Sequence, residues 1–136
     1  MDQNKRWSNR VIVVAVLLTG LGAAHLIDDF LYGMPADFGL SNEFSQVLAA
    51  VYFITTGLLL VLTARGSKAG YIGSMGFGLF LFLTDALKHG SEGLFSEPWR
   101  GGLFSRSLAF GTLLTSIVLV IVSYYAWYYS HRAGEQ

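Results

Sequence analysis

Apolar residues in this chain are gathered into four long runs that are separated by short, more polar segments. The runs cover residues 11–27, 47–64, 71–87 and about 108–128. Each run is close to the ~20 residues that an α-helix needs to cross the hydrocarbon layer of a membrane. A transmembrane barrel would instead need shorter segments of about 10 residues with alternating polarity. The pattern therefore predicts four membrane-spanning helices.

The segments between the runs are short, so consecutive helices are expected to run in opposite directions and no room is left for a second domain. We therefore predict a single domain, residues 1–136, with the fold class of an all-α integral membrane protein. Its predicted architecture is an antiparallel bundle of four transmembrane helices. The predicted helices cover residues of about 11–32, 44–64, 69–89 and 104–129.

The first run has a second interpretation, because basic residues before an apolar stretch and small residues after it are also typical of a signal peptide. In this chain, the small residues near position 24 are followed by further apolar positions at Leu26, Ile27 and Phe30. This continuation favours a retained first helix.

A weak internal repeat relates the first and third predicted helices. One shift of the chain aligns the Gly-Leu-Gly of residues 20–22 with the Gly-Phe-Gly of residues 76–78, and Asp29 with Asp85. A duplicated two-helix hairpin would produce this match, but chance would also produce it in glycine-rich helices. From the matched spacing we expect these two helices to be neighbours, with Asp29 and Asp85 facing each other above the glycines.

The composition supports a membrane protein and narrows its partners. Hydrophobic residues make up 53% of the chain and charged residues only 13%, whereas a soluble domain carries about a quarter charged residues. The lipid bilayer is therefore the expected partner, and a homo-oligomer or a larger membrane complex stays open. The net charge of zero gives no reason to expect nucleic acid as a partner. Because the chain has no cysteine, a metal would need histidine, carboxylate or backbone oxygen as ligands.

The basic residues predict a multi-pass protein of the cell membrane with both termini in the cytoplasm, because lysine and arginine gather on the cytoplasmic side. Six basic residues stand on the side of the two termini, namely Lys5, Arg6, Arg10, Arg65, Lys68 and Arg132. Three stand on the other side, namely Lys88, Arg100 and Arg106. Most acidic residues, Asp29 and Asp85 among them, then fall near the outer face.

Two histidine–carboxylate pairs interrupt the apolar helices near their predicted outer ends. His25 stands four residues before Asp29, and Asp85 stands four residues before His89. This spacing places both members of a pair on one face of a helix. Ionisable groups inside a membrane span are costly and usually mark a functional site. Imidazole and carboxylate are suitable ligands for a divalent metal, so these four residues form a candidate metal site.

Three further charged residues lie at the same level and are candidate supporting residues: Asp28, Lys88 and Arg106. If the two cations neutralise the aspartates, the cluster is a structural ion-pair network that binds nothing. A b-type haem held by His25 and His89 is a third interpretation. It is weaker, because the aspartates make the pocket acidic, whereas haem propionates prefer basic partners. All three interpretations stay open at this point.

Glycines on the first and third helices are candidate packing positions, because small residues allow helix backbones to approach closely. They are Gly22, Gly70, Gly73 and Gly78.

Three classes of function fit this pattern. The favoured one is a small membrane protein whose outer His/Asp cluster binds a cation, a proton or a metal in transport or sensing. The alternatives are a membrane-embedded metal or haem redox enzyme and an accessory subunit of a larger membrane complex. Catalytic residues are not assigned, and no nucleotide-binding loop, serine-nucleophile elbow or zincin helix is present in the sequence.

Overall fold

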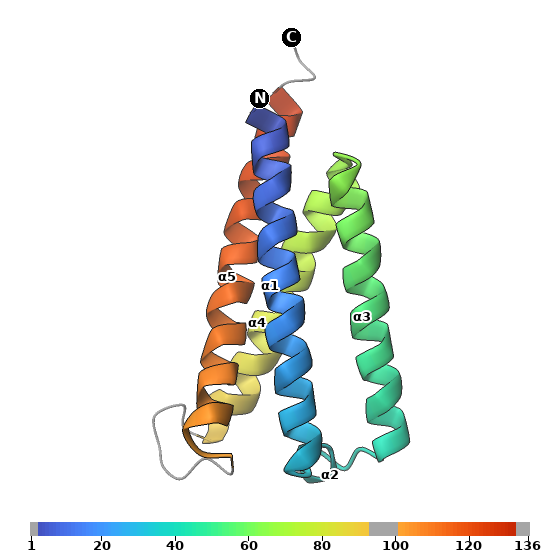
Figure 1. Ribbon diagram of the computed structural model, residues 1–136, viewed down its shortest axis with the longest axis vertical. Helices are drawn as coiled ribbons and strands as arrows, with labels where there is room; N and C mark the ends of the chain where they lie inside the picture. The colour runs from blue at the N-terminus through green and yellow to red at the C-terminus, as the bar shows by residue number, and fades with distance from the viewer. Residues whose placement is uncertain (1–2, 93–100, 133–136) are drawn as a thin grey trace.

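The computed structural model describes residues 3–92 and 101–132, without the side chains of residues 89–92. Within these ranges the chain forms five helices and no strand (Figure 1). They are α1 (Gln3–Leu31), α2 (Met34–Asp37), α3 (Asn42–Ala64), α4 (Lys68–Glu92) and α5 (Gly102–Arg132). All except the short α2 are long and apolar enough to cross a membrane. The predicted all-α fold with four spanning helices is therefore confirmed.

The long helices form an antiparallel bundle with both termini at one end (Figure 1). In the described part of the chain, α1 packs against α3 and α5, and α4 also packs against α3 and α5. Consequently α1 and α4 lie at opposite corners and meet at few positions. The prediction that these two helices pack side by side was wrong along most of their length, because the short connections place α3 between them and α5 closes the bundle on the other side. At the acidic end, however, Lys88 of α4 is bonded to Asp29 of α1, and Asp29 and Asp85 line the same cavity. The proposed duplication stays a prediction.

The first and last helices extend beyond their predicted bounds at the end of the bundle that holds the termini. The first helix begins at Gln3 rather than near residue 11, and the last continues to Arg132 rather than ending near residue 129. Their polar ends need no hydrocarbon around them, because the backbone hydrogen bonds of a helix are internal and persist in water. Both extensions lie at the end of the bundle that holds the termini (Figure 1).

The interior of the bundle combines a small apolar core, which includes Leu18, Tyr71 and Leu119, with buried hydroxyl-bearing residues, and many large apolar residues point outward. The buried residues of α3 are Ser45, Thr56 and Thr63, whereas Ile54 on the same helix is 70% exposed. This distribution suits a membrane, because lipid solvates apolar side chains and small residues let helices approach. Some of these hydroxyls are bonded locally or between helices: Ser8, for example, donates to the carbonyl oxygen of Thr63 over 2.8 Å. Others, such as those of Ser116 and Ser123, are buried without a hydrogen-bond partner among the described residues.

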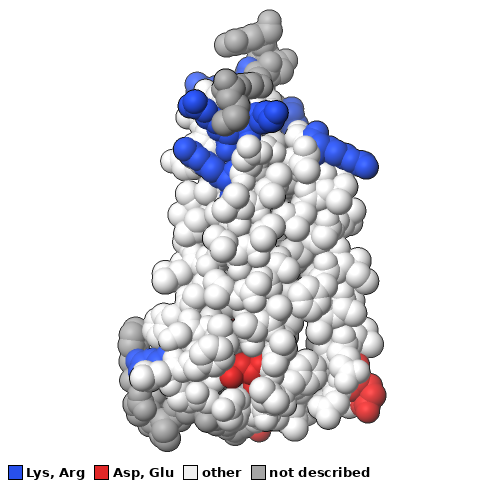
Figure 2. Space-filling model, viewed as in Figure 1, with Lys and Arg blue, Asp and Glu red and all other residues white. Residues whose placement is uncertain are grey.

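We call the end with the termini the basic end, because it carries the six basic residues Lys5, Arg6, Arg10, Arg65, Lys68 and Arg132. The opposite end, with α2 and the described aspartates, is the acidic end. Figure 2 shows most lysine and arginine atoms at the first and acidic atoms toward the second, with an uncharged band between them. That band is where lipid hydrocarbon would lie. The predicted cytoplasmic position of the basic end stays a prediction.

At the basic end, α3 and α4 are joined by a tight turn. Gly66 adopts a positive φ of 69°, and its N–H donates to the carbonyl oxygen of Thr63 over 2.9 Å. The N–H of Ser67 donates to the carbonyl oxygen of Leu62 over 3.0 Å. This pair of bonds ends a helix on a left-handed residue, a position that favours glycine. Gly70 follows, and a Cβ atom there would lie 2.5 Å from the backbone nitrogen of Thr63.

Further along its length, α4 turns toward α5. A Cβ atom on Gly78 would lie 3.0 Å from the carbonyl oxygen of Ser116 in α5, so glycine allows this approach. In Figure 1, α4 passes behind α1 and leans from α3 toward α5. At the acidic end, the turn glycines Gly33 and Gly39 and the N-cap Ser41 lead the chain through α2 into α3. The acidic halves of α3 and α4 are therefore held apart.

Candidate functional site

A cavity of about 470 Å³ lies between the helices at the acidic end. Its volume falls within the roughly 300–1,000 Å³ of small-molecule binding sites. The walls are largely apolar and aromatic, and the main contributors are Leu26, Phe30, Phe38, Leu48, Val51, Phe77, Phe80 and Leu81. The charged or phenolic groups that line it are His25, Asp29, Tyr52, Asp85 and Lys88. The site thus combines an apolar chamber with one polar cluster.

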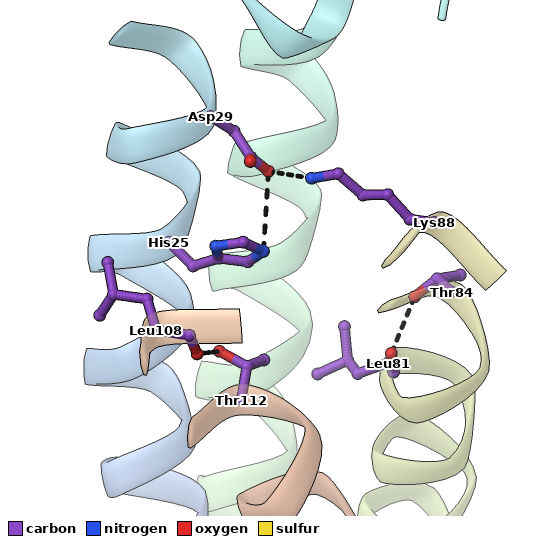
Figure 3. Close-up of polar contacts among 7 residues, drawn as sticks. All are labelled: His25, Asp29, Leu81, Thr84, Lys88, Leu108 and Thr112. Atoms are coloured by element: carbon purple, nitrogen blue, oxygen red, sulfur yellow. Dashed lines mark hydrogen bonds and ion pairs between the residues drawn. The ribbon is translucent and has the colours of Figure 1, made fainter. Parts of the chain in front are cut away.

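An ion pair between α1 and α4 forms the centre of the polar cluster. The Nζ atom of Lys88 donates to Oδ2 of Asp29 over 2.6 Å (Figure 3). The two side chains are only 15% and 16% exposed. Charged donors and acceptors at this distance form the stronger class of hydrogen bond. The charge of Asp29 is therefore balanced by Lys88, one of the two cations that the sequence offered as partners.

His25 lies on the other side of the same carboxylate oxygen. Its Nε2 atom is 3.9 Å from Oδ2 of Asp29, and its side chain is 7% exposed. This distance is too long for a hydrogen bond but short enough for electrostatic attraction when the ring is protonated. The four-residue spacing on α1 brings the two side chains together (Figure 3).

Asp85 is the second carboxylate of the cavity. Its Oδ2 atom is buried and has no hydrogen-bond partner among the described residues. Tyr52 of α3 lines the same cavity, but its hydroxyl donates to the carbonyl oxygen of Leu18 over 3.2 Å. A buried oxygen that lacks a partner is costly unless something binds there.

The threonine hydroxyls beside the cluster are bonded within their own helices. Thr84 donates to the carbonyl oxygen of Leu81, and Thr112 donates to that of Leu108 (Figure 3). Thr84 also donates to the carbonyl oxygen of Phe80. Such back-bonding is common for threonine in membrane helices. Polar recognition in the cavity therefore falls mainly on the charged side chains.

The remaining predicted site residues lie elsewhere. Asp28 is buried, at 8% exposure, but does not line the cavity. Arg106 stands over the ring of Phe110, with 6.0 Å to its centroid, and does not line the cavity either. His89 belongs to α4, but its side chain lies outside the described residues. The structure thus brings together His25, Asp29, Asp85 and Lys88 of the predicted set.

The arrangement gives a metal little support. Among the side chains that the structure describes, no group of three His, Asp or Glu residues could hold a metal ion. In addition, the carboxylate next to His25, that of Asp29, is already bonded to Lys88. Lys88 would compete with a metal for the same oxygen. The metal and haem interpretations both involve His89, whose side chain is not described, and they stay predictions.

The predicted packing glycines serve different contacts. Gly70 and Gly73 lie against Thr63 and Leu59 of α3, and Gly78 lies against α5. Gly22 lies against the hydroxyl end of Tyr52, in space that a Cβ atom would fill. We expected Gly22 and Gly78 to face each other, but they lie against different helices. Gly22 instead admits the ring of Tyr52 to the cavity wall.

Tyr52 and the aromatic walls were not predicted from the sequence as parts of a site. Tyr52 is one hydroxyl in an apolar helix, and the wall residues come from separate runs that look like ordinary lipid-facing positions. The available signal was the number of phenylalanines at the same predicted depth as the His/Asp pairs.

No known family model, no curated protein and no solved structure matches this chain.

Proposed function

We propose that this protein binds a small lipophilic molecule inside the membrane, in transport or sensing. The observation that carries the proposal is the cavity of about 470 Å³ at the acidic end, with apolar walls and a polar cluster. A ligand with an apolar body and a polar group matches both parts. Binding sites of this kind usually combine hydrophobic walls with a few placed polar groups.

The charged cluster supports a functional role for the cavity. Asp29, Asp85 and Lys88 lie within helices that could span a membrane, where each charge is expensive. Replacement of a buried ion pair by apolar residues is often neutral or stabilising, so stability alone gives little reason for such a pair. Ligand recognition gives a reason for the second carboxylate, Asp85, which the ion pair does not include.

An organic ligand fits these residues better than a bare metal ion does. A metal would take carboxylate and imidazole ligands but would leave the aromatic walls, such as Phe77 and Phe80, without a role. A lipophilic molecule would fill the walls and meet the cluster with one polar group. This keeps the expected binding role of the His/Asp cluster and changes the nature of the ligand.

Filling the cavity tests the proposal. Ala49 of α3 lines the cavity, and its neighbour Ala50 is exposed on the same helix. We expect Ala49→Trp to remove lipophilic molecules that copurify with the wild-type protein, as detected by mass spectrometry of organic extracts. Ala50→Trp is the matched control and should keep them. The proposal fails if the wild type and Ala49→Trp carry the same molecules in equal amounts, or if the wild type carries none.

A further inference from the structure

The charges around the cavity define the class of ligand. We propose that the ligand is a lipophilic cation, such as an organic ammonium, whose positive group lies against Asp85. This inference rests on the proposed function, because it assumes that the cavity binds a lipophilic molecule. It adds the sign of the ligand's charge and the residue that recognises it.

The described lining contains two carboxyl side chains and one lysine. Lys88 is bonded to Asp29, so the ammonium and one carboxylate neutralise each other. The oxygen Oδ2 of Asp85 is buried and has no hydrogen-bond partner among the described residues. The described lining therefore carries one more carboxylate than ammonium groups when His25 is neutral.

The groups that line the cavity with Asp85 come from all four long helices. The titratable groups of the lining are His25 and Asp29 from α1, Tyr52 from α3 and Lys88 from α4 itself. From α5, the described lining residue is Thr112, whose hydroxyl donates to its own helix. His25 and Lys88 attract the carboxylate of Asp85 without a hydrogen bond to its Oδ2 atom, and we therefore assign this oxygen to the ligand.

The walls of the cavity are partly aromatic. The aromatic residues Phe30, Phe77 and Phe80 line the cavity together with Asp85. Aromatic faces attract organic cations, and they also pack against an apolar body. Because opposite charges attract strongly where water is scarce, a cation gains from the excess carboxylate, and an anion is repelled by it. An inorganic ion would satisfy the carboxylate but not the walls.

Two probes of the same shape and opposite charge test this inference. Tetraphenylphosphonium and tetraphenylborate both carry four phenyl groups around a central atom. We would measure their binding by equilibrium dialysis against protein in nanodiscs of zwitterionic lipid, with empty nanodiscs as the blank. We expect the cation to bind at least about tenfold more tightly than the anion after this correction.

Substitutions then assign the preference to one residue. Asp85→Asn should weaken binding of the phosphonium by about tenfold or more, because it removes the charge but keeps the shape. Asp37→Asn is the control, since Asp37 is an exposed carboxylate at the same end and lies outside the lining. Lys88→Met should change the preference in the other direction, toward still stronger selection of the cation. This second variant keeps the test decisive if Asp85→Asn does not fold.

The outcomes separate the two proposals. If Ala49→Trp removes binding of both probes but the anion binds as well as the cation, the cation inference is overturned and the cavity remains a binding site. The inference is also overturned if neither Asp85→Asn nor Lys88→Met changes the preference. If neither probe shows binding that is sensitive to Ala49→Trp, the proposed function itself fails.

Discussion

At the basic end, α3 and α4 are in backbone contact, whereas at the acidic end the same two helices are separated by a cavity of about 470 Å³. Glycine position explains the difference. Gly70 allows α4 to touch α3 beside the turn, and Gly78 allows it to touch α5 further along. Because α4 contacts α3 near the turn and α5 further along, it leaves a space beside α3 at the acidic end. The same bundle can therefore be closed at one end and hollow at the other.

Polar groups are also used differently at the two ends. At the basic end, Trp7 stacks on Tyr125 with 5.0 Å between ring centroids, and Arg10 lies over Trp7 at 4.4 Å. There the basic groups are exposed, and Arg10 and Arg132 each lie over an aromatic ring. At the acidic end, the Asp29–Lys88 pair is largely buried and lines a cavity. The basic end is therefore closed by packing contacts, whereas the acidic end holds the candidate site.

The largest expected effect comes from disrupting the closed end. Gly70→Leu should lower the free energy of unfolding by at least about 3 kcal/mol, because the new side chain meets the backbone of Thr63, which cannot move aside cheaply. Unfolding in mixed detergent micelles would measure it. Gly76→Leu is the control on the same helix, since no atom lies within 4 Å of a Cβ atom there. Equal losses for the two variants would contradict the role of Gly70.

The intermediate effect compares one lysine contact at each end. Lys88→Met should lower the free energy of unfolding by about 2–3 kcal/mol, because it leaves the charge of Asp29 buried and unbalanced. Adding Asp29→Asn should recover at least half of that loss. Lys68→Met is the control at the basic end, where Lys68 meets His131 at 3.3 Å in an exposed position. It should cost less than about 0.5 kcal/mol.

Two outcomes would contradict a difference between the two ends. If Lys88→Met and Lys68→Met cost the same in the unfolding measurement, the acidic-end pair has no special environment. If the double variant with Asp29→Asn is as unstable as the sum of the single variants, the two side chains do not interact.

The four spanning helices and their antiparallel order could be predicted from the sequence, because apolar runs near the length of a membrane span leave few other folds. The faces of the helices were also informative: Gly22 and Gly78 do lie against other helices. Their partners could not be predicted, since a periodic pattern identifies a packing face but not the helix that covers it. The expectation that α1 and α4 pack side by side was wrong for this reason, although Asp29 and Asp85 do line the same cavity.

The candidate site was predictable only in part. His25, Asp29 and Asp85 stood out because charges are rare in apolar helices, and Lys88 was recognised as a partner for an aspartate. The cavity could not be predicted, because its volume depends on how α4 leans between α3 and α5. That lean follows from contacts such as Gly78 with Ser116, which join segments far apart in the chain.

The smallest expected effect concerns one hydrogen bond at the closed end. Ser8 of α1 is buried and donates to the carbonyl oxygen of Thr63 over 2.8 Å, at the level where α3 also meets Gly70. Ser8→Ala should lower the free energy of unfolding by about 1 kcal/mol, because hydrogen bonds between membrane helices contribute modestly. Ser107→Ala is the control: this exposed serine donates to Leu103 in its own helix, and its loss should be close to neutral. A loss for Ser8→Ala no larger than for Ser107→Ala would show that backbone contact at Gly70, rather than side-chain hydrogen bonding, closes the basic end.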